Sequence, residues 1–378
     1  MGQRISAHNF PKRQDSMHQA DVIVLLSGGL DSLLCAKLLQ EQGLSVLGVH
    51  MVSPFFGDKK KCPFWERQYG IRVLHRDISN DFVAMLRNGP KFGFGKTLNP
   101  CVDCKILLLR EAKKCMEEYG AKAIASGAVV GQRPMSQRRD VMNTILREAD
   151  VKDCLIRPLS AHHLPPTKLE ENGFIDRSKL LGISGRGRKE QLQLAKERYH
   201  FQSIPSPGGG CKLTEHENAR RYWMVLHTNK SSDAQDFYLA NTGRQYWQSR
   251  GDEAFWLSLG RNKNDNEILK TLKRADDSIL FFPHIPSPIA LARHGRNWPN
   301  DLLLSAARLT LSYAVKALTQ RNKATLRLET DNSWIEETIE ANRQEAWSLP
   351  PWETIRKEIR ASQKKESKEN DESNERSF

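Results

Sequence analysis

The sequence lacks three features that would point to a membrane, to secretion or to a common class of nucleotide-binding protein. No apolar run approaches the roughly 18 residues that cross a bilayer as a helix. Residues 1–19 include Arg4, Lys12 and Arg13 but no apolar core, which is unlike a secretory signal peptide. The Walker A pattern, Gly-x4-Gly-Lys followed by Ser or Thr, is absent. We therefore expect a cytoplasmic protein with no membrane partner.

Cysteine is scarce, and its count argues against a disulfide framework. Seven cysteines, an odd number, are spread over 378 residues without a signal peptide, as is typical of reduced intracellular thiols. Some of them are candidate ligands. They are Cys35, Cys62, Cys101, Cys104, Cys115, Cys154 and Cys211.

Acidic residues are fewer than basic ones. The chain has 58 Lys and Arg against 45 Asp and Glu, a formal net charge of +13. A basic protein binds a polyanion by releasing counterions, so nucleic acid is the expected partner. The length favours two or three domains, and a hydrophobic fraction of 39% is enough for real cores.

The strongest local signal lies at residues 22–32. Five apolar residues at 22–26 predict a buried parallel strand, which Gly28 and Gly29 turn sharply into a helix. Because glycine has no Cβ, the backbone N–H groups of this turn can converge on a phosphate, and Ser27 and Ser32 add hydroxyl donors. The alternative is an ordinary strand-to-helix turn that uses glycine and serine for geometry alone.

Asp31 lies within this predicted anion site. A carboxylate beside a phosphate is unfavourable unless a divalent cation lies between them, so Asp31 predicts Mg²⁺.

Strands and helices alternate through the first half of the chain. Strands are expected at residues 45–51, 70–78, 121–126 and 153–159, and helices at residues 32–42 and 106–119. Such an alternation forms a parallel sheet, which collects ligands at the carboxyl ends of its strands. Met51, at the end of the second strand, is expected near an adenine, whereas His50 is interpreted as a histidine at the edge of the core.

Cys101 and Cys104 form a Cys-x-x-Cys pattern at the start of a predicted helix. If both lie in its first turn, their spacing places both sulfurs on one face, and the helix N-terminus lowers their thiol pKa. Such a pair suits a redox dithiol, half of a zinc site, two ligands of an iron–sulfur cluster, or packing.

Cys211 follows three glycines, which let the backbone approach something bulky and bond the sulfurs of a cluster. Together with Cys101 and Cys104, it suits a [4Fe–4S] cluster with one iron open to exogenous sulfide. Zinc would need a fourth ligand, for which His216 is the nearest candidate. Two other interpretations stay open: the three thiols relay a persulfide, or they do not form a shared site.

Two polar segments are candidates for contact with a substrate. Residues 127–139 leave the carboxyl end of a strand, where Gln137 could bond phosphate or a base edge and Arg133 could neutralise a phosphate. Residues 184–189 place three cations in the first turn of the next helix. Positive charge at a helix N-terminus is unfavourable, so this pattern indicates an anion bound there. A solvated loop and a solvated basic face are the alternatives. The three cations are Arg186, Arg188 and Lys189.

The composition changes over residues 237–327, where aromatic pairs such as Phe255-Trp256 alternate with arginines. These aromatics could stack on bases, or they could form the core of a small domain. Residues 362–378 are highly charged and are expected to be disordered.

These motifs resemble a known family. Residues 27–32, SGGLDS, are similar to the SGGxDS loop of the PP-loop ATP pyrophosphatases, and residues 21–221 resemble the tRNA 4-thiouridine synthase family in its short, three-cysteine forms. The loop, the Cys-x-x-Cys pattern, a GxxxGQxxxSQ element at residues 127–137 and the Gly-Gly-Gly-Cys ending at Cys211 carry the resemblance. It implies that ATP adenylates a uracil carbonyl oxygen of tRNA, which sulfur then replaces. The short N-terminal stretch implies no THUMP domain, and no rhodanese-like domain is expected.

The expected fold is α/β. A parallel-sheet PP-loop domain, like an adenine nucleotide alpha hydrolase, spans residues 21–228, and a smaller α+β domain spans residues 229–330. The smaller domain resembles the RNA-binding domain of NFACT proteins through a GR-x4-N pattern that starts at Gly260. A flexible tail at residues 1–20 and a helical to disordered charged tail at residues 331–378 complete the chain.

The resemblance implies a tRNA sulfurtransferase that uses ATP, Mg²⁺ and a [4Fe–4S] cluster. Its expected partners are tRNA, sulfide or a persulfide carrier as sulfur donor, and a second copy in a homodimer. Two other classes stay open: a PP-loop ligase or amidotransferase for a small molecule, and a non-catalytic RNA-binding adaptor. The expected ATP ligands are Ser27, Gly28, Gly29, Leu30, Asp31, Ser32, Met51, Gly127 and Gln132. The expected RNA contacts are Arg133, Gln137, Arg186, Arg188 and Lys189, and the catalytic residues are Asp31, Cys101, Cys104 and Cys211.

Overall fold

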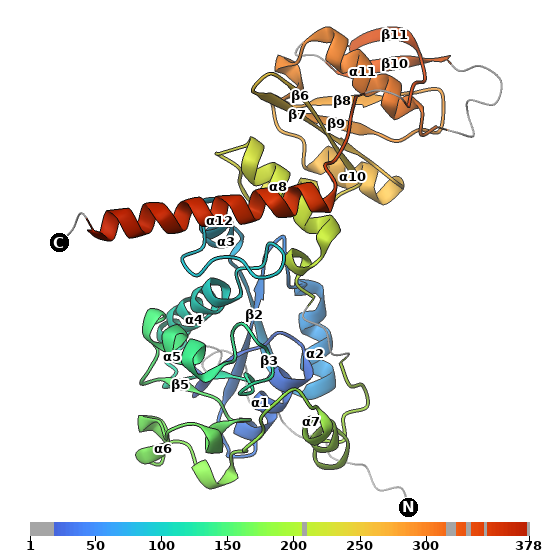
Figure 1. The fold of residues 1–378 in the computed structure, drawn as a ribbon. Coiled ribbons are helices and arrows are strands. Elements are labelled where there is room, and N and C mark those ends of the chain that lie inside the picture. Colours follow the sequence, from blue (N-terminus) through green and yellow to red (C-terminus); the bar gives the residue numbers. More distant parts are fainter. Residues whose placement is uncertain (1–18, 206–209, 315–322, 330–333, 344–345, 376–378) are drawn as a thin grey trace, which may run out of the picture. The chain divides into compact units, whose positions relative to one another are not determined.

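The computed structural model describes residues 19–205, 210–314, 323–329, 334–343 and 346–375 (Figure 1). The chain forms two compact units that interleave along the sequence. The first comprises Met1–Val52, Gly57–Asp77 and Cys101–Gly210, and the second Ser53–Phe56, Ile78–Pro100 and Cys211–Phe378. This division differs from the continuous domains expected from the sequence, because two short segments of the first half belong to the second unit. Of the flexible tail expected at residues 1–20, residues 1–18 lie outside the described residues, and Ala20 is buried with its N–H donated to Tyr119 O.

The first unit is built on a five-stranded parallel sheet with the strand order β3-β2-β1-β4-β5. All four residues of β1 are buried, as a central strand covered on both faces requires. The strands are β1 (Val22–Leu25), β2 (Val46–Val52), β3 (Arg72–Asp77), β4 (Ala123–Ser126) and β5 (Leu155–Ile156).

Helices gather around this sheet (Figure 1). The helix α4 turns Val102, Ile106 and Leu109 into the interior at a spacing of three to four residues, which is the period of one helix face. The helix α1 is buried almost all round and packs against β1, β2 and β4. The helices are α1 (Leu30–Gln40), α2 (Cys62–Tyr69), α4 (Cys101–Glu118), α5 (Arg139–Glu148), α6 (Lys168–Glu171) and α7 (Lys189–Gln193).

The strand order defines where a ligand can bind. The chain runs outward from β1 to β2 and β3, then returns to place β4 on the other side of β1. The carboxyl ends of β1 and β4 therefore flank the point at which the strand order reverses, where α/β sheets form their ligand crevice. Ser27–Ser32 follow one of these ends, and Gly127 follows the other.

The second unit contains a six-stranded antiparallel sheet with the order β11-β10-β8-β9-β7-β6. A parallel-sheet α/β domain followed by an α+β region is the fold class that the sequence predicted, and the prediction is confirmed. The strands are β6 (Arg244–Arg250), β7 (Glu253–Leu259), β8 (Ser278–Phe281), β9 (Ala290–Arg293), β10 (Lys323–Glu329) and β11 (Trp334–Glu340).

Aromatic packing joins separate segments of the second unit. Phe55 lies 5.0 Å, between ring centroids, from both Tyr222 and Phe237, and 5.3 Å from Phe82. The core thus draws Ser53–Phe56 into this unit. The helices are α3 (Ser79–Arg87), α8 (His216–Thr228), α9 (Ala234–Ala240), α10 (Lys263–Thr271), α11 (Asn300–Leu311) and α12 (Trp352–Glu375).

Two expectations for the end of the chain were wrong. The segment from residue 331 includes β11, which pairs with β10, rather than only helix and disorder. The helix α12 continues to Glu375, through residues expected to be disordered. Its first turns are anchored by the buried Ile355 and Ile359, four residues apart, and by a 2.7 Å hydrogen bond from Trp223 Nε1 to Glu358.

The aromatic pairs of the second unit form its core. Trp247, Phe255 and Trp256 are each less than 9% exposed, and the two tryptophans stack with their centroids 5.4 Å apart. Asn262 caps α10 by accepting a hydrogen bond from the backbone N–H of Asp265, and Asn266 accepts one from Ile289. The buried aromatics are not available to stack on bases. None of the helices that the structure describes is long and apolar enough to cross a membrane.

Candidate functional site

The loop between β1 and α1 is an ordered strand-to-helix turn. Gly28 has a φ of +75°, in the left-handed region that favours glycine, and a Cβ there would lie 2.0 Å from the ring of Trp65. The Oγ of Ser27 accepts a hydrogen bond from Gly29 N at 3.3 Å, and Ser32 Oγ donates to Gly29 O at 2.8 Å. The turn therefore has the conformation that directs backbone N–H groups toward an anion at a helix N-terminus.

Asp31 lies in the first turn of α1 and is bound to the loop that follows β4. Its Oδ2 accepts a hydrogen bond from Gln132 Nε2 at 3.1 Å and lies 3.9 Å from the guanidinium of Arg188. Its Oδ1 is buried and accepts no hydrogen bond from the described residues, and the same is true of Gln132 Oε1. A buried oxygen without a partner is costly, so this pair is poised for a further ligand.

Two unpartnered hard oxygens fit a magnesium ion. Mg²⁺ in nucleotide sites is usually bound by one or two protein oxygens together with phosphate oxygens and water. Asp31 supplies the carboxylate, and Gln132 is the nearest candidate for a second oxygen.

Gly127 explains why the loops after β1 and β4 meet. A Cβ on Gly127 would lie 2.3 Å from Asp31 O and 2.8 Å from Ser32 N, both of them backbone atoms. Only glycine therefore allows these two backbones to approach so closely.

We expect Gly127→Ala to destabilise the protein by about 1–3 kcal/mol, because the new methyl group overpacks against backbone that cannot rotate away. It should also weaken ATP binding, since relieving the clash displaces Asp31. Thermal unfolding and calorimetric ATP titration measure the two effects. The matched control is Gly187→Ala, because a Cβ there meets nothing within 4 Å, and its stability should change by less than about 0.5 kcal/mol. Equal stability for both variants would contradict the packing argument.

Comparison with known proteins identifies the architecture around this site. A family model for the tRNA methyl transferase HUP domain matches residues 20–153, a segment that includes β1, the loop, Asp31, β4 and Gln132. Over these residues the first unit is similar to a HUP domain, and we use that name for it below. The match agrees with the PP-loop resemblance of the sequence, whereas binding of a nucleotide by residues 27–32 stays a prediction.

Curated relatives of the HUP domain have names from tRNA modification. The probable tRNA sulfurtransferase of Thermococcus kodakarensis is 27% identical over 175 residues, which are 43% of this chain and 41% of that protein. The tRNA-specific 2-thiouridylase MnmA of Syntrophomonas wolfei subsp. wolfei is 31% identical over 192 residues, 48% of this chain and 51% of that protein. The chain thus spans about half, or less, of the length of these relatives.

A solved structure, that of a predicted subunit of tRNA methyltransferase from Methanocaldococcus jannaschii, aligns with 47% of this chain and 76% of its own. Its identity of 18% and TM-score of 0.31 are too low to establish a common fold. The resemblance of the second unit to the RNA-binding domain of NFACT proteins stays a prediction.

Two other predicted ATP ligands are buried in the HUP domain. Leu30 is 2% exposed and packs with Val129 and Ile183, so its side chain anchors the loop to the core of the first unit. Met51 is 5% exposed within β2. A contact of either residue with ATP stays a prediction.

His50 is a core histidine, as interpreted from the sequence. Its Nε2 accepts a hydrogen bond from Asp58 N at 2.9 Å, which leaves the proton on Nδ1 to be donated to Leu26 O at 2.9 Å. The ring is 4% exposed and meets Trp65 edge-on, with centroids 4.7 Å apart. Burial lowers the pKa of His50 below its ordinary value of 6.5.

Protonation of His50 should therefore oppose folding. Because the pKa in the folded state lies below that of the unfolded chain, the contribution of His50 to stability is complete above about pH 6.5 and is lost as the pH falls toward the folded-state pKa. Denaturant titrations across this range should show a smaller loss of unfolding free energy on acidification in His50→Gln than in the wild type. His75→Gln, on the exposed neighbouring position of β3, is the control and should behave like the wild type. A larger loss of unfolding free energy on acidification in His50→Gln than in the wild type would contradict a His50 that is neutral in the folded state.

Cys101 and Cys104 lie in the first turn of α4, so the prediction that places both on one helix face is confirmed. Both are half-buried. Cys211 belongs to the second unit, where its carbonyl accepts hydrogen bonds from Thr214 N and Oγ1. The grouping of the three thiolates, and hence the cluster, stays a prediction.

The four other cysteines have structural surroundings. Burial raises the pKa of Cys35, Cys62, Cys115 and Cys154, which disfavours the reactive thiolate. Sulfur chemistry is therefore best sought at Cys101, Cys104 and Cys211.

The predicted RNA contacts differ in exposure. Arg133, Arg186 and Lys189 are exposed, whereas Gln137 is 6% exposed within its loop. The expectation of three cations in a first helical turn was wrong, because α7 begins at Lys189 and the other two precede it. Arg188 instead lies beside Asp31. Contact of these residues with RNA stays a prediction.

Proposed function

We propose that the protein is an ATP-dependent tRNA sulfurtransferase, which adenylates a uridine carbonyl oxygen and replaces it with sulfur in a reaction of the 4-thiouridine type. One observation carries the proposal. The Asp31 carboxylate is held by Gln132 beside a glycine turn at the switch point of a parallel sheet, and one of its oxygens has no partner among the described residues. This is the arrangement that a magnesium nucleotide requires.

The relatives support the choice of reaction. Their names are tRNA sulfurtransferase and tRNA-specific 2-thiouridylase, and the family model is that of a tRNA methyl transferase HUP domain. The net charge of +13 favours a polyanionic substrate such as tRNA.

The glycines and Asp31 of the loop have separate roles in adenylation. The backbone N–H groups of Gly28 and Gly29 would bind phosphate oxygens, with Gly29 exchanging its present acceptor, Ser27 Oγ, for the phosphate. Asp31 and Gln132 would hold Mg²⁺, which would neutralise the charge of the phosphates. The uracil oxygen then attacks the α phosphorus, and pyrophosphate leaves. Arg188 lies 3.9 Å from Asp31 and would add a positive charge beside the phosphates of a bound nucleotide.

Sulfur enters in the second half of the reaction. We assign this half to Cys101, Cys104 and Cys211. A persulfide carrier protein would pass its outer sulfur to one of these thiolates and leave as a thiol, whereas sulfide would be bound at this centre without being oxidised. A [4Fe–4S] cluster bound to the three thiolates would supply an open iron for sulfide. Arg133, Gln137, Arg186 and Lys189 are the proposed contacts with tRNA, and a homodimer is the proposed assembly.

The proposal is tested by incubating the anaerobically purified chain with ATP, Mg²⁺, sulfide and unmodified tRNA, followed by nucleoside analysis. Iron and acid-labile sulfide are quantified on the same preparation. We expect a thiouridine that requires ATP, together with AMP and pyrophosphate in equal amounts. A nucleoside profile without a thionucleoside would contradict the proposed function.

A further inference from the structure

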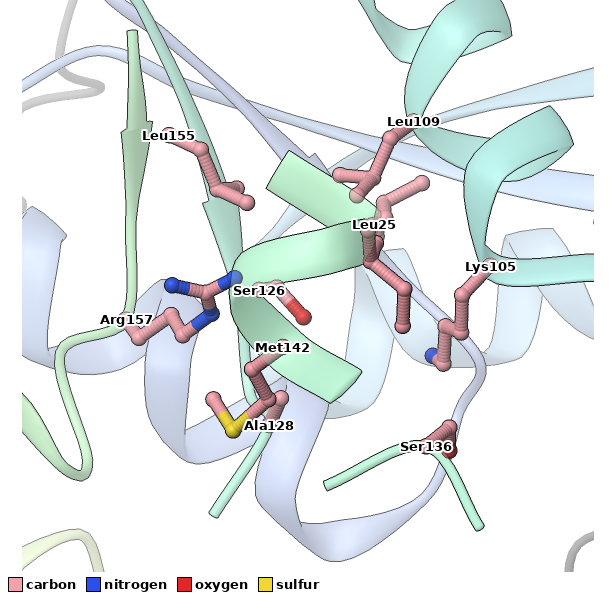
Figure 2. Close-up of a pocket in the computed structure, with 10 residues that line it drawn as sticks. Leu25, Lys105, Leu109, Ser126, Ala128, Ser136, Met142, Leu155 and Arg157 are labelled. Carbon is pink, nitrogen blue, oxygen red and sulfur yellow. The ribbon is translucent and has the colours of Figure 1, made fainter. Parts of the chain in front are cut away.

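A small cavity of the HUP domain lies at the carboxyl ends of β1, β4 and β5 (Figure 2). Its volume is about 20 Å³. On the same measure, a cavity that holds one water has a volume of roughly 10–15 Å³. The cavity therefore has room for one small ion and not for a phosphate group or a nucleobase. The residues that line it are Leu25, Lys105, Leu109, Ser126, Ala128, Ser136, Met142, Ile145, Leu155 and Arg157.

Two cations face this cavity, whose lining contains no acidic residue. Lys105 reaches it from α4, and Arg157 directly follows β5. Figure 2 shows Arg157 beside Ser126 and Lys105 on the opposite side, nearer Ser136. Among the described residues, neither side chain has a hydrogen-bond or ion-pair partner, and none of the residues that line the cavity is acidic. Removing an unpaired charge from water is costly, and a bound anion offsets that cost.

Two serine side chains add hydroxyl donors to the same space. Ser126 and Ser136 are each 7% exposed, and their Oγ atoms have no hydrogen-bond partner among the described residues. The cavity thus collects four donor side chains and no acceptor of opposite charge. All four side chains donate hydrogen bonds and none of the lining residues is acidic, so the ligand that would accept from all four is an anion.

The remaining lining selects the kind of anion. Leu25, Leu109 and Met142 place apolar and thioether atoms against the ligand, which suits a polarizable and weakly hydrated ion. Chloride, bromide and hydrosulfide share this chemistry and carry a single charge.

The cavity lies between the two proposed reaction centres of the domain. Lys105 directly follows Cys104, and both thiols of the Cys-x-x-Cys pattern are close enough to act on its charge. On the other side, Ser126 directly precedes Gly127, whose backbone packs on Asp31.

We propose that Lys105, Arg157, Ser126 and Ser136 bind a small polarizable monoanion, and that in the reaction this anion is hydrosulfide, the sulfur donor. The assignment of hydrosulfide rests on the proposed function. A C–S bond would form at the carbon that carries the adenylated oxygen, the C–O bond to AMP would break, and AMP would leave with the electron pair while the S–H proton passes to water. The exchange needs no oxidant or reductant.

Bromide is the probe for the site. Its NMR line width, measured on the full chain under anaerobic conditions, should show saturable binding that sulfide reverses, and anomalous scattering from bromide-soaked crystals should place the ion in this cavity. Lys105→Met and Arg157→Gln should each weaken bromide binding about tenfold or more, since each removes a charged donor. Arg157→Lys keeps the charge and should restore most of the affinity.

Lys113→Met is the matched control, because Lys113 lies on the same helix and its ammonium pairs with Asp150 at the surface. It should bind bromide like the wild type, and thermal unfolding checks that every variant folds. In the thiolation assay, Lys105→Met should raise the KM for sulfide about tenfold or more and leave the KM for ATP unchanged.

Three results have different meanings. Equal bromide binding by the wild type, Lys105→Met and Arg157→Gln would overturn the site. Loss of binding in these variants without displacement by sulfide would overturn hydrosulfide as the ligand. Displacement by sulfide in a protein that forms no thionucleoside would count against the proposed function and leave the anion site standing.

Discussion

Asp31→Asn should lower the rate of tRNA-dependent pyrophosphate release at least about 100-fold, the scale on which losing one preorganised electrostatic group slows an enzyme. The amide keeps the size of the carboxylate but cannot hold Mg²⁺ against the phosphates. The fold should be retained, because Oδ1 of Asp31 accepts no hydrogen bond from the described residues. Pyrophosphate release and the midpoint of thermal unfolding measure the two effects.

The control for Asp31 is Asp140→Asn, which alters an exposed carboxylate of the same HUP domain that pairs with Arg138. It should leave pyrophosphate release unchanged. If both variants kept the activity of the wild type, Asp31 would have no role in handling the nucleotide, and the domain would use its loop for structure alone.

Cys211→Ser should separate the two halves of the reaction. We expect AMP and pyrophosphate to form as in the wild type, while the yield of thionucleoside falls about 100-fold or more, as expected when a reacting group is removed. The hydroxyl of serine cannot carry a persulfide sulfur and is a poor ligand for iron. The fold should be retained, because the Cys211 carbonyl, and not its side chain, accepts the hydrogen bond from Thr214. Nucleoside analysis and pyrophosphate release on one reaction mixture give both values.

Cys154→Ser is the matched control, because burial raises the pKa of Cys154 and its Sγ contacts only Val151 O among the hydrogen-bond acceptors of the described residues, at 3.7 Å. It should thiolate tRNA normally. If Cys211→Ser lost ATP turnover as well as thiolation, Cys211 would act before or during adenylation, and the proposed division of labour would be wrong.

The strands of the first unit could be predicted because their signals are local. The apolar run at residues 22–26 and the glycine pair after it specify β1 and the start of α1 within eleven residues. The parallel orientation of the strands follows from the alternation of strands and helices, whereas their order in the sheet was not predicted.

Features that depend on distant contacts could not be predicted. Phe55 belongs to the second unit because Tyr222 and Phe237 surround it, and these residues lie more than 160 positions further along the chain. Similarly, α12 is held by Trp223 through Glu358, so a segment with the composition of a disordered tail forms a helix.

The site was predicted as separate residues rather than as an arrangement. Asp31 and Gln132 were both expected to bind the nucleotide, but the hydrogen bond between them spans 101 positions and has no local signal. Trp65, which packs on Gly28, was missed for the same reason. Arg157 offered a usable signal, since a charged residue just after a buried strand lies where parallel sheets bind their ligands.

The central claim is that ATP activates the uracil oxygen of tRNA by adenylation. It is tested most directly with tRNA whose uracil carbonyl carries a heavy oxygen isotope, incubated with the protein, ATP, Mg²⁺ and sulfide. Because the attacking oxygen becomes part of the phosphate that leaves, we expect one heavy oxygen in each AMP that accompanies a thionucleoside. AMP without the isotope, formed alongside thionucleoside, would show that the uracil oxygen never joins the α phosphorus and would contradict this account.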